Sequence, residues 1–580
     1  MSEQTLIKGK DASLEASLLK MQAIFDNLTI DLDKQQWLNP AENIYSLHIF
    51  DKACPALFTN GKGASRKATQ ASAMGEYLER LSTNYFFSDY YLTLREDRDG
   101  QQFNDWLYYP HDRHFALEDY RQALTPELWQ IYDPHQELTA HHLLSFNDTS
   151  PMIRAIAMTE QTTNERVYFP VNILSNLYAS NGLSAGNTPL ESAVQGLSEV
   201  FERWVKNKIL TENICLPEVP DEVIAGFPAI AQAIADLKAQ GLAVSVRDAS
   251  LGGQFPVMNV TLFNPKTGQC FASFGAHPLF EVALERTLTE SLQGRHLQNL
   301  DGFQTPTLDQ FAVAEAENLE NHFIDSSGLI NLHMLATTPD YDFCAWEGAQ
   351  TTAEQWSELL AKVTGLGFKV YRADYQHHDF YATRLIVPGI SEVYPMDELV
   401  LKNQNDGRLL REALFSAEQG DYAAVLNVLD QVGFSDHQGV ASLIGLMPDP
   451  NQAWSALKIA DLRFWTELAL QDYEAAADSL YIAKAYATAG AASWQPIYEL
   501  MDLCLALKLQ DKDFVHYEAT LTHLFGQDVV AKAVQHLNGE SRFWGLSVGR
   551  AMFFESQRHQ AMLAVLDKAR AAKQTFGYTD

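Results

Sequence analysis

The spacing of hydrophobic residues divides the chain into two parts with different predicted secondary structure. Up to about Lys402, short runs rich in β-branched and aromatic residues alternate with stretches whose apolar residues recur at helical spacing. Five such runs predict strands, at residues 244–247, 257–263, 271–274, 370–373 and 384–387. A turn signal, Asn264-Pro-Lys-Thr-Gly268, joins the second and third runs in a hairpin. The pattern therefore predicts an α/β (α+β) fold for residues 1–402.

After Lys402 the pattern is helical throughout residues 403–580. The segments Gln419–Ala424 and Leu470–Ala475 resemble each other, and each precedes an apolar helical run; Asp513 opens a weaker copy. They are similar to the second helices of tetratricopeptide repeats, although the copies do not keep that repeat's period of about 34 residues. We predict an all-α, tetratricopeptide-like array of helical hairpins, which would bind proteins or dimerise. A plain helical bundle that caps the first domain is an equal alternative.

Three predicted helices in the first part carry carboxylates and arginines on one face. Their sequences are Ser72-Ala-Met-Gly-Glu76-Tyr-Leu-Glu79-Arg80, Gln195-Gly-Leu-Ser-Glu199-Val-Phe-Glu202-Arg203 and Arg286-Thr-Leu-Thr-Glu290. Carboxylates three residues apart share a helix face and repel each other unless a cation lies between them. Carboxylate oxygens suit Mg²⁺, which is commonly bound together with phosphate, and arginine makes bidentate contacts to phosphate. The spacing therefore indicates a divalent cation beside an anion.

The alternative interpretation is that these are ordinary solvated helix faces, and for any one segment alone that would be the better one. Each segment, however, has small or apolar neighbours, and each follows a glycine-bearing stretch that we expect to be a loop, at residues 59–65, 180–186 and 274–278. The repetition favours three units that converge on one site. The stretch Gly61–Ser65 lacks the spacing of a Walker P-loop, which excludes that type of nucleotide site.

The three patterns, S-x-x-x-E-x-x-E-R, Q-x-x-x-E-x-x-E-R and R-x-x-x-E in this order, resemble the nucleotide-binding signature of the YcaO family. The resemblance runs from Gly9-Lys10-Asp11 to Pro388-Gly389. It implies a YcaO-type ATP-binding domain in residues 1–402, with ATP and Mg²⁺ as cofactors. It also implies a role for each matching residue. The metal ligands would be Glu76, Glu79, Glu199, Glu202 and Glu290. The ATP-binding residues would be Lys10, Ser17, Ser72, Gln195, Arg203 and Arg286, with Arg286 and Glu290 as the catalytic pair.

Members of the family use ATP to phosphorylate the oxygen of a peptide backbone amide. A neighbouring Cys or Ser side chain then closes an azoline ring, or an external sulfur donor gives a thioamide. Stand-alone members imply a third role, as an accessory factor for β-methylthiolation of a small-subunit ribosomal protein. The implied partners are that ribosomal protein, its methylthiotransferase and a second copy of the chain, bound through the helical region. An ATP-responsive scaffold, an azoline- or thioamide-forming cyclodehydratase and a small-molecule ligase or kinase stay open as alternatives.

The composition of the chain indicates which partners, which thiol state and which compartment to expect. The net charge of −32 argues against direct binding of nucleic acid or an anionic membrane. The five cysteines are scattered without a CxxC pair, which indicates reduced thiols and neither a disulfide framework nor a zinc site. The N-terminal residues lack an apolar signal segment, and no apolar run reaches membrane-spanning length. We therefore expect a cytoplasmic enzyme.

Overall fold

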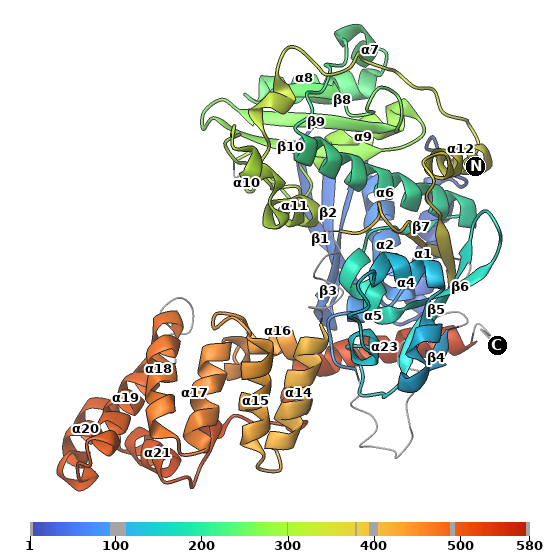
Figure 1. The fold of residues 1–580 in the computed structure, drawn as a ribbon. Coiled ribbons are helices and arrows are strands. Elements are labelled where there is room, and N and C mark those ends of the chain that lie inside the picture. Colours follow the sequence, from blue (N-terminus) through green and yellow to red (C-terminus); the bar gives the residue numbers. More distant parts are fainter. Residues whose placement is uncertain are drawn as a thin grey trace.

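The computed structural model describes residues 4–92, 112–298, 300–377, 380–393, 404–487 and 494–575. An α+β body is followed by a row of helices that extends away from it (Figure 1). The described residues form three antiparallel sheets. The first joins β1 (Leu32–Ala41), β2 (Ile44–Asp51) and β3 (Cys54–Gly63); the second joins β8 (Ala243–Asp248), β9 (Val257–Asn264) and β10 (Gln269–Ala276). The third has the order β4 (Arg113–Phe115), β5 (Ile153–Glu160), β11 (Tyr371–His377), β12 (Phe380–Ile386) and β7 (Leu183–Gly186), with β6 (Arg166–Pro170) paired to β5.

All five predicted strands are confirmed, as β8 to β12, and β9 and β10 form the predicted hairpin. The expectation that the three glycine-bearing stretches are loops is wrong. Residues 59–63 lie in β3, residues 183–186 in β7 and residues 274–276 in β10. The glycines are there because the next helix packs close to the strand. A Cβ added at Gly61 would lie 2.3 Å from the Thr69 carbonyl oxygen, and one at Gly275 would lie 2.3 Å from the Thr287 hydroxyl.

A helix follows each of these three strands, and each helix carries one of the three motifs. The helices are α2 (Arg66–Ser82) after β3, α6 (Pro189–Glu212) after β7 and α9 (Phe280–Glu290) after β10. Ser65 and Thr188 cap α2 and α6 by accepting hydrogen bonds from the first-turn backbone, which fixes where these helices begin. Each motif helix therefore leaves a different sheet, and the prediction that the motifs are helical is confirmed.

The helical row is built of antiparallel hairpins (Figure 1). Its helices are α14 (Asn405–Ala417), α15 (Tyr422–Val432), α16 (Val440–Ile444), α17 (Ile459–Ala469), α18 (Tyr473–Ala487), α19 (Gln495–Leu509), α20 (Glu518–Phe525), α21 (Gln527–Leu537) and α22 (Ala551–Glu555). The similar segments noted in the sequence are the hairpin turns. Asp421 and Asp472 each accept a hydrogen bond at 3.2 Å from the backbone N–H three residues on, at the start of α15 and α18. This arrangement agrees with an array of hairpins and not with a bundle that caps the body.

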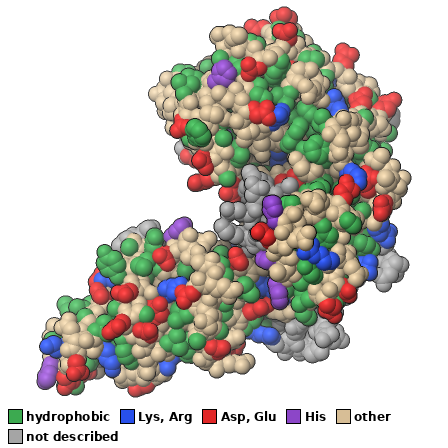
Figure 2. Space-filling view, in the orientation of Figure 1, with side chains coloured by type: hydrophobic (Ala, Val, Ile, Leu, Met, Phe, Trp, Pro, Cys, Tyr) green, Lys and Arg blue, Asp and Glu red, His purple; other side chains and the backbone are tan. Residues whose placement is uncertain are grey.

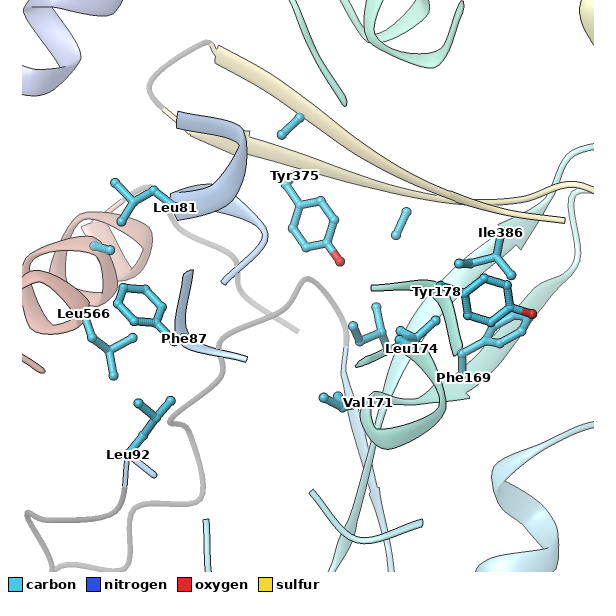
Figure 3. Packing of buried hydrophobic residues seen from close by; sticks show 14 of the residues in the cluster. Leu81, Phe87, Leu92, Phe169, Val171, Leu174, Tyr178, Tyr375, Ile386 and Leu566 are labelled. Carbon is cyan, nitrogen blue, oxygen red and sulfur yellow. The ribbon is translucent and has the colours of Figure 1, made fainter. Parts of the chain in front are cut away.

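The long helix α23 (Gln557–Thr575) returns from the row to the body (Figure 1). Its Met562, Val565, Leu566 and Ala569 join the core that contains β3 and α2. Figure 3 shows Leu566 beside Phe87. α23 therefore packs on the body although it belongs to the range predicted as the helical domain, residues 403–580, and that division stays a prediction. The boundary itself, at residue 402, lies outside the described residues.

Buried arginines join the row to the body. Arg411 of α14 is fully buried and donates hydrogen bonds to the carbonyl oxygens of Ile444, in the row, and Phe146, in the body. Its guanidinium stacks on the Tyr91 ring, with 4.5 Å between the guanidinium carbon and the ring centroid. Acidic side chains are spread over both parts of the visible surface (Figure 2). Among the helices that the structure describes, none has the length and apolar character needed to cross a bilayer.

Candidate active site

Every residue that the motifs and the family resemblance predicted lines a single cavity of about 1000 Å³. These residues are Lys10, Ser17, Ser72, Glu76, Glu79, Gln195, Glu199, Glu202, Arg203, Arg286 and Glu290. They come from the N-terminal segment and from α2, α6 and α9. The three strand–helix units therefore converge, and the volume is at the upper end of small-molecule sites.

The carboxylates of the motif helices are held by basic side chains. Arg80 lies 3.4 Å from Glu76 and 3.2 Å from Glu79, and Arg203 lies 2.8 Å from Glu199. Lys62, at the end of β3, forms an ion pair with Glu290. Charge compensation at the site thus combines residues of α2, α6 and α9 with a lysine from a strand.

Burial and crowding of like charges shift the ionisation of these groups. Burial, with Glu199 and Glu76 nearby, raises the pKa of Glu79 to about 8, although Arg80 opposes the shift. Burial and the Arg286 guanidinium lower the pKa of Lys62 to about 8. A divalent cation among these carboxylates would relieve the repulsion that the structure shows between them.

One wall of the cavity is neutral. Burial, with Arg286 and Lys10 close by, lowers the pKa of His277 to about 3, so its imidazole is uncharged near neutral pH. Its Nδ1 accepts a hydrogen bond from the Leu279 backbone N–H at 3.0 Å. The ring therefore orders the start of α9 and adds no charge to the cavity.

The N-terminal segment is tied to the start of α6. The ammonium of Lys10 lies 3.2 Å from the buried carboxylate of Glu191, which also accepts a hydrogen bond from the Asp11 backbone N–H at 2.9 Å. The Ser17 hydroxyl donates to Asn187 at 2.7 Å. Lys10 was expected to face phosphate; it lines the cavity, but here a carboxylate is its partner.

The donor set fits an anion such as the phosphates of ATP. Arg286 donates to the Gln195 side chain, and its buried Nε–H has no hydrogen-bond partner. Arg203 likewise has a buried guanidinium nitrogen, Nη1, without a hydrogen-bond partner. Buried donors without acceptors are costly, so these two groups are suited to a bound anion.

The described carboxylates of the cavity have the chemistry to bind a metal ion, although they are not arranged as a metal-binding cluster. The carboxylates are the oxygen ligands that Mg²⁺ prefers. Within the described ranges, however, no three His, Cys, Asp or Glu side chains are arranged to hold a metal ion. Glu76, Glu79, Glu199 and Glu290 are instead paired with basic side chains. The metal-ligand set therefore stays a prediction.

Sequence reasoning missed six lysines and arginines that line the cavity: Lys8, Lys20, Lys62, Arg80, Lys206 and Arg295. Arg80 was part of a motif but had no assigned role. Lys206 lies four residues after Glu202 on the motif face of α6, and that spacing was the available signal. Lys62 lies in a stretch interpreted as a loop, so there was no periodic pattern from which to expect its side chain at the site.

Two family models together match most of the chain. The model described as an ATP- and Mg²⁺-binding YcaO cyclodehydratase matches residues 60–391, and that of the YcaO cyclodehydratase C-terminal domain matches residues 407–575. The chain belongs to the YcaO family. ATP and Mg²⁺ are the cofactors in the YcaO family description, as the resemblance implied.

Two bacterial proteins are similar to the chain over their whole length. The chain is 42% identical, over 588 residues and 99% of both chains, to the Escherichia coli K12 protein named ribosomal protein S12 methylthiotransferase accessory factor YcaO. It is also 42% identical, over 594 residues and 99% of both chains, to an uncharacterized protein of Haemophilus influenzae. The solved structure of YcaO from Methanopyrus kandleri bound with AMPPCP and Mg²⁺ is 18% identical, with a TM-score of 0.39 over 67% of this chain and 95% of that one.

Proposed function

We propose that this protein binds ATP with Mg²⁺ in the cavity between α2, α6 and α9 and uses ATP to phosphorylate a peptide backbone amide. The observation that supports the proposal most is the convergence of the predicted site residues on one cavity, in which Arg203 and Arg286 have guanidinium N–H groups without hydrogen-bond acceptors. When bound, ATP would supply the transferable phosphoryl group. The role of the protein is then positioning and charge compensation.

Each group of side chains would have a role that follows from its chemistry. Glu76, Glu79, Glu199, Glu202 and Glu290 would hold Mg²⁺. Arg203 and Arg286 would donate to phosphate oxygens, and Ser72 and Gln195 would complete the shell as neutral hydrogen-bonding groups. Lys10 would reach phosphate only by leaving Glu191. Lys62 would give up Glu290 to the metal ion and offset phosphate charge instead.

Calorimetry tests the nucleotide and metal requirement. Glu76→Gln and Glu202→Gln remove one charge each and keep the side-chain shape, so each should weaken ATP binding at least tenfold, about 1.4 kcal/mol. Glu499→Gln, on α19 in the helical row, is the matched control and should bind as the wild type does. Wild-type affinity in the two site variants, or in the presence of a chelator, would refute a metal-dependent site.

We further propose an accessory role in β-methylthiolation of a small-subunit ribosomal protein, because the full-length Escherichia coli relative is named for that role. Phosphate release by the purified protein should rise when the ribosomal protein or its methylthiotransferase is added. Release without any response to either protein would count against this role.

Formation of an azoline is the second candidate, since both matching family models are described as cyclodehydratases. It predicts that a peptide with Cys or Ser loses the mass of one water when incubated with ATP. An unchanged peptide mass, together with stimulated phosphate release, would favour the accessory role.

A further inference from the structure

The end of α11 (Ala316–Ile324) forms a wall of the cavity, although none of the three motifs includes it. Residues 322–326 all line the cavity. This α11 end contributes an aromatic side chain, Phe323, to the part of the cavity wall beside Arg203.

Phe323 stacks on Arg203, which has a buried guanidinium donor without a hydrogen-bond acceptor. The guanidinium carbon lies 4.3 Å from the centre of the Phe323 ring. Glu199 holds the same guanidinium at 2.8 Å. A ring on the face of a guanidinium is attracted to its charge and leaves the edge N–H groups available for acceptors. Stacking thus fixes the plane of Arg203 without using up its donors.

The backbone around Phe323 is itself held in place. The ammonium of Lys206, one turn after Arg203 on α6, donates to the His322 carbonyl oxygen at 2.6 Å, and both residues are buried. The imidazole Nε2 of His322 lies 2.9 Å from the Leu329 carbonyl oxygen. A Cβ at Gly328 would lie 2.2 Å from that imidazole, so the chain closes tightly against it. These contacts therefore hold the backbone that carries Phe323 in place.

We propose that Phe323 is a positioning residue that orients Arg203 toward the phosphates of bound nucleotide. The inference rests on the proposed function of the cavity. Without the ring, the ion pair with Glu199 alone would hold the guanidinium, which would be free to rotate about that contact and turn its other N–H groups away from phosphate. The ring acts only through Arg203 and needs no contact with the nucleotide.

Calorimetric binding of AMPPCP with Mg²⁺ to the full chain tests the proposal. Phe323→Leu keeps an apolar side chain but removes the ring, and we expect it to weaken binding about tenfold, or about 1.4 kcal/mol. Phe323→Tyr keeps the ring and should bind within about twofold of the wild type. Phe311→Leu removes an aromatic that is 86% exposed on α10 (Gln310–Ala314) and should have no effect. Equal binding by Phe323→Leu and Phe311→Leu would overturn the proposal.

A double-mutant cycle separates action through Arg203 from a general effect on the cavity. In an Arg203→Lys background, the change Phe323→Leu should cost less than about twofold in binding. An undiminished tenfold loss in that background would show that Phe323 does not act through Arg203.

A crystal structure of Phe323→Leu without nucleotide decides the positioning even if the wild type binds no ATP. A guanidinium rotated out of the plane that it has beside Phe323 supports the proposal, and an unmoved one overturns it. Failure of the wild type to bind AMPPCP would instead refute the proposed function of the cavity.

Discussion

At the residue scale, the Arg286 guanidinium combines one hydrogen bond within the protein with a buried donor that has no acceptor. One guanidinium nitrogen donates to Gln195 and so links α9 to α6, while the buried Nε–H has no acceptor. A hydrogen bond from a charged donor contributes about 1.5–3 kcal/mol to stability. An arginine that offsets charge on a transferring phosphoryl group contributes roughly 10³-fold or more in rate. The second contribution should dominate in any variant that still folds.

We predict that Arg286→Ala remains folded and loses turnover. The lost link to Gln195 should lower Tm only slightly, since a change of 1 kcal/mol shifts Tm by about 2–4 °C in domains of about 150–250 residues and by less in a larger protein. Phosphate release should fall to background. Arg463→Ala, which breaks a surface ion pair to Asp430 in the helical row, is the control and should keep full activity. Normal phosphate release from well-folded Arg286→Ala protein would leave Arg286 with a structural role only.

Most residues of the candidate site could be predicted from the sequence because they share helix faces. The i, i+3 and i+4 spacing of Glu199, Glu202 and Arg203 has a direct meaning in a helix. Lys62 was not predictable in this way, because it approaches the cavity from a strand of another sheet. The partners of the carboxylates were not predictable either. Whether Glu79 meets Arg80 or a metal ion depends on tertiary placement and not on spacing.

At the scale of elements, strands with mixed composition were harder to predict than helices. The strands β8 to β12 contain clear β-branched or aromatic runs and were found. β1 alternates buried and exposed residues irregularly and carries Lys, Gln and Asn, so it has little strand signal. β3 ends in Asn-Gly-Lys-Gly, which has the composition of a turn, although the glycines serve close packing against α2.

The helix α23 carries a lysine into the core of the body. Lys573 is 3% exposed and donates to the Asn84 side chain at 2.8 Å. Burial lowers the pKa of Lys573 to about 7. Between pH 7 and the ordinary lysine pKa, the unfolded chain therefore binds a proton that the folded chain does not. The contribution of this group to the free energy of unfolding rises with pH in that window and is least favourable below pH 7.

We predict that the difference in Tm between Lys573→Met and the wild type depends on pH. Relative to the wild type, the variant should be most stable near pH 6.5 and should lose that relative advantage as the pH rises to 9. Lys568→Met, on the same helix, removes an ammonium that donates to the Thr29 carbonyl oxygen and is the control for loss of a lysine from α23. Thermal unfolding followed by circular dichroism at several pH values measures both. A constant difference for Lys573→Met would show that its ammonium is charged in the folded protein.

At the scale of the whole molecule, the body and the helical row are joined by buried polar contacts as well as by α23. Arg408 donates to the Ser145 carbonyl oxygen at 2.8 Å, close to the contacts that Arg411 makes. The Tyr91 backbone N–H donates to the Gly445 carbonyl oxygen at 2.9 Å. Such a joint transmits unfolding of one part to the other.

Arg411→Ala should therefore uncouple the two parts. It leaves the carbonyl oxygens of Ile444 and Phe146 without this donor and creates a cavity against Tyr91, which together should cost about 3–5 kcal/mol. We expect calorimetry to show a lower unfolding temperature and a separate transition for the row. Lys484→Ala, which removes ion pairs to Glu499 and Asp502 within the row, should leave a single transition. A single, unshifted transition in Arg411→Ala would show that the contacts of Arg411 are not needed to couple the two parts.

The return of α23 to the body also has a consequence for how the protein is made. Leu566 completes a core whose other members, among them Leu57 and Phe87, leave the ribosome far earlier. At a synthesis rate of about 5–20 residues per second, that apolar surface stays uncovered for roughly 25–100 s before α23 is synthesised. The nucleotide-binding body thus reaches its final form only after the helical row has been made. A nascent chain interrupted within the row would expose the surface that chaperones and proteases recognise.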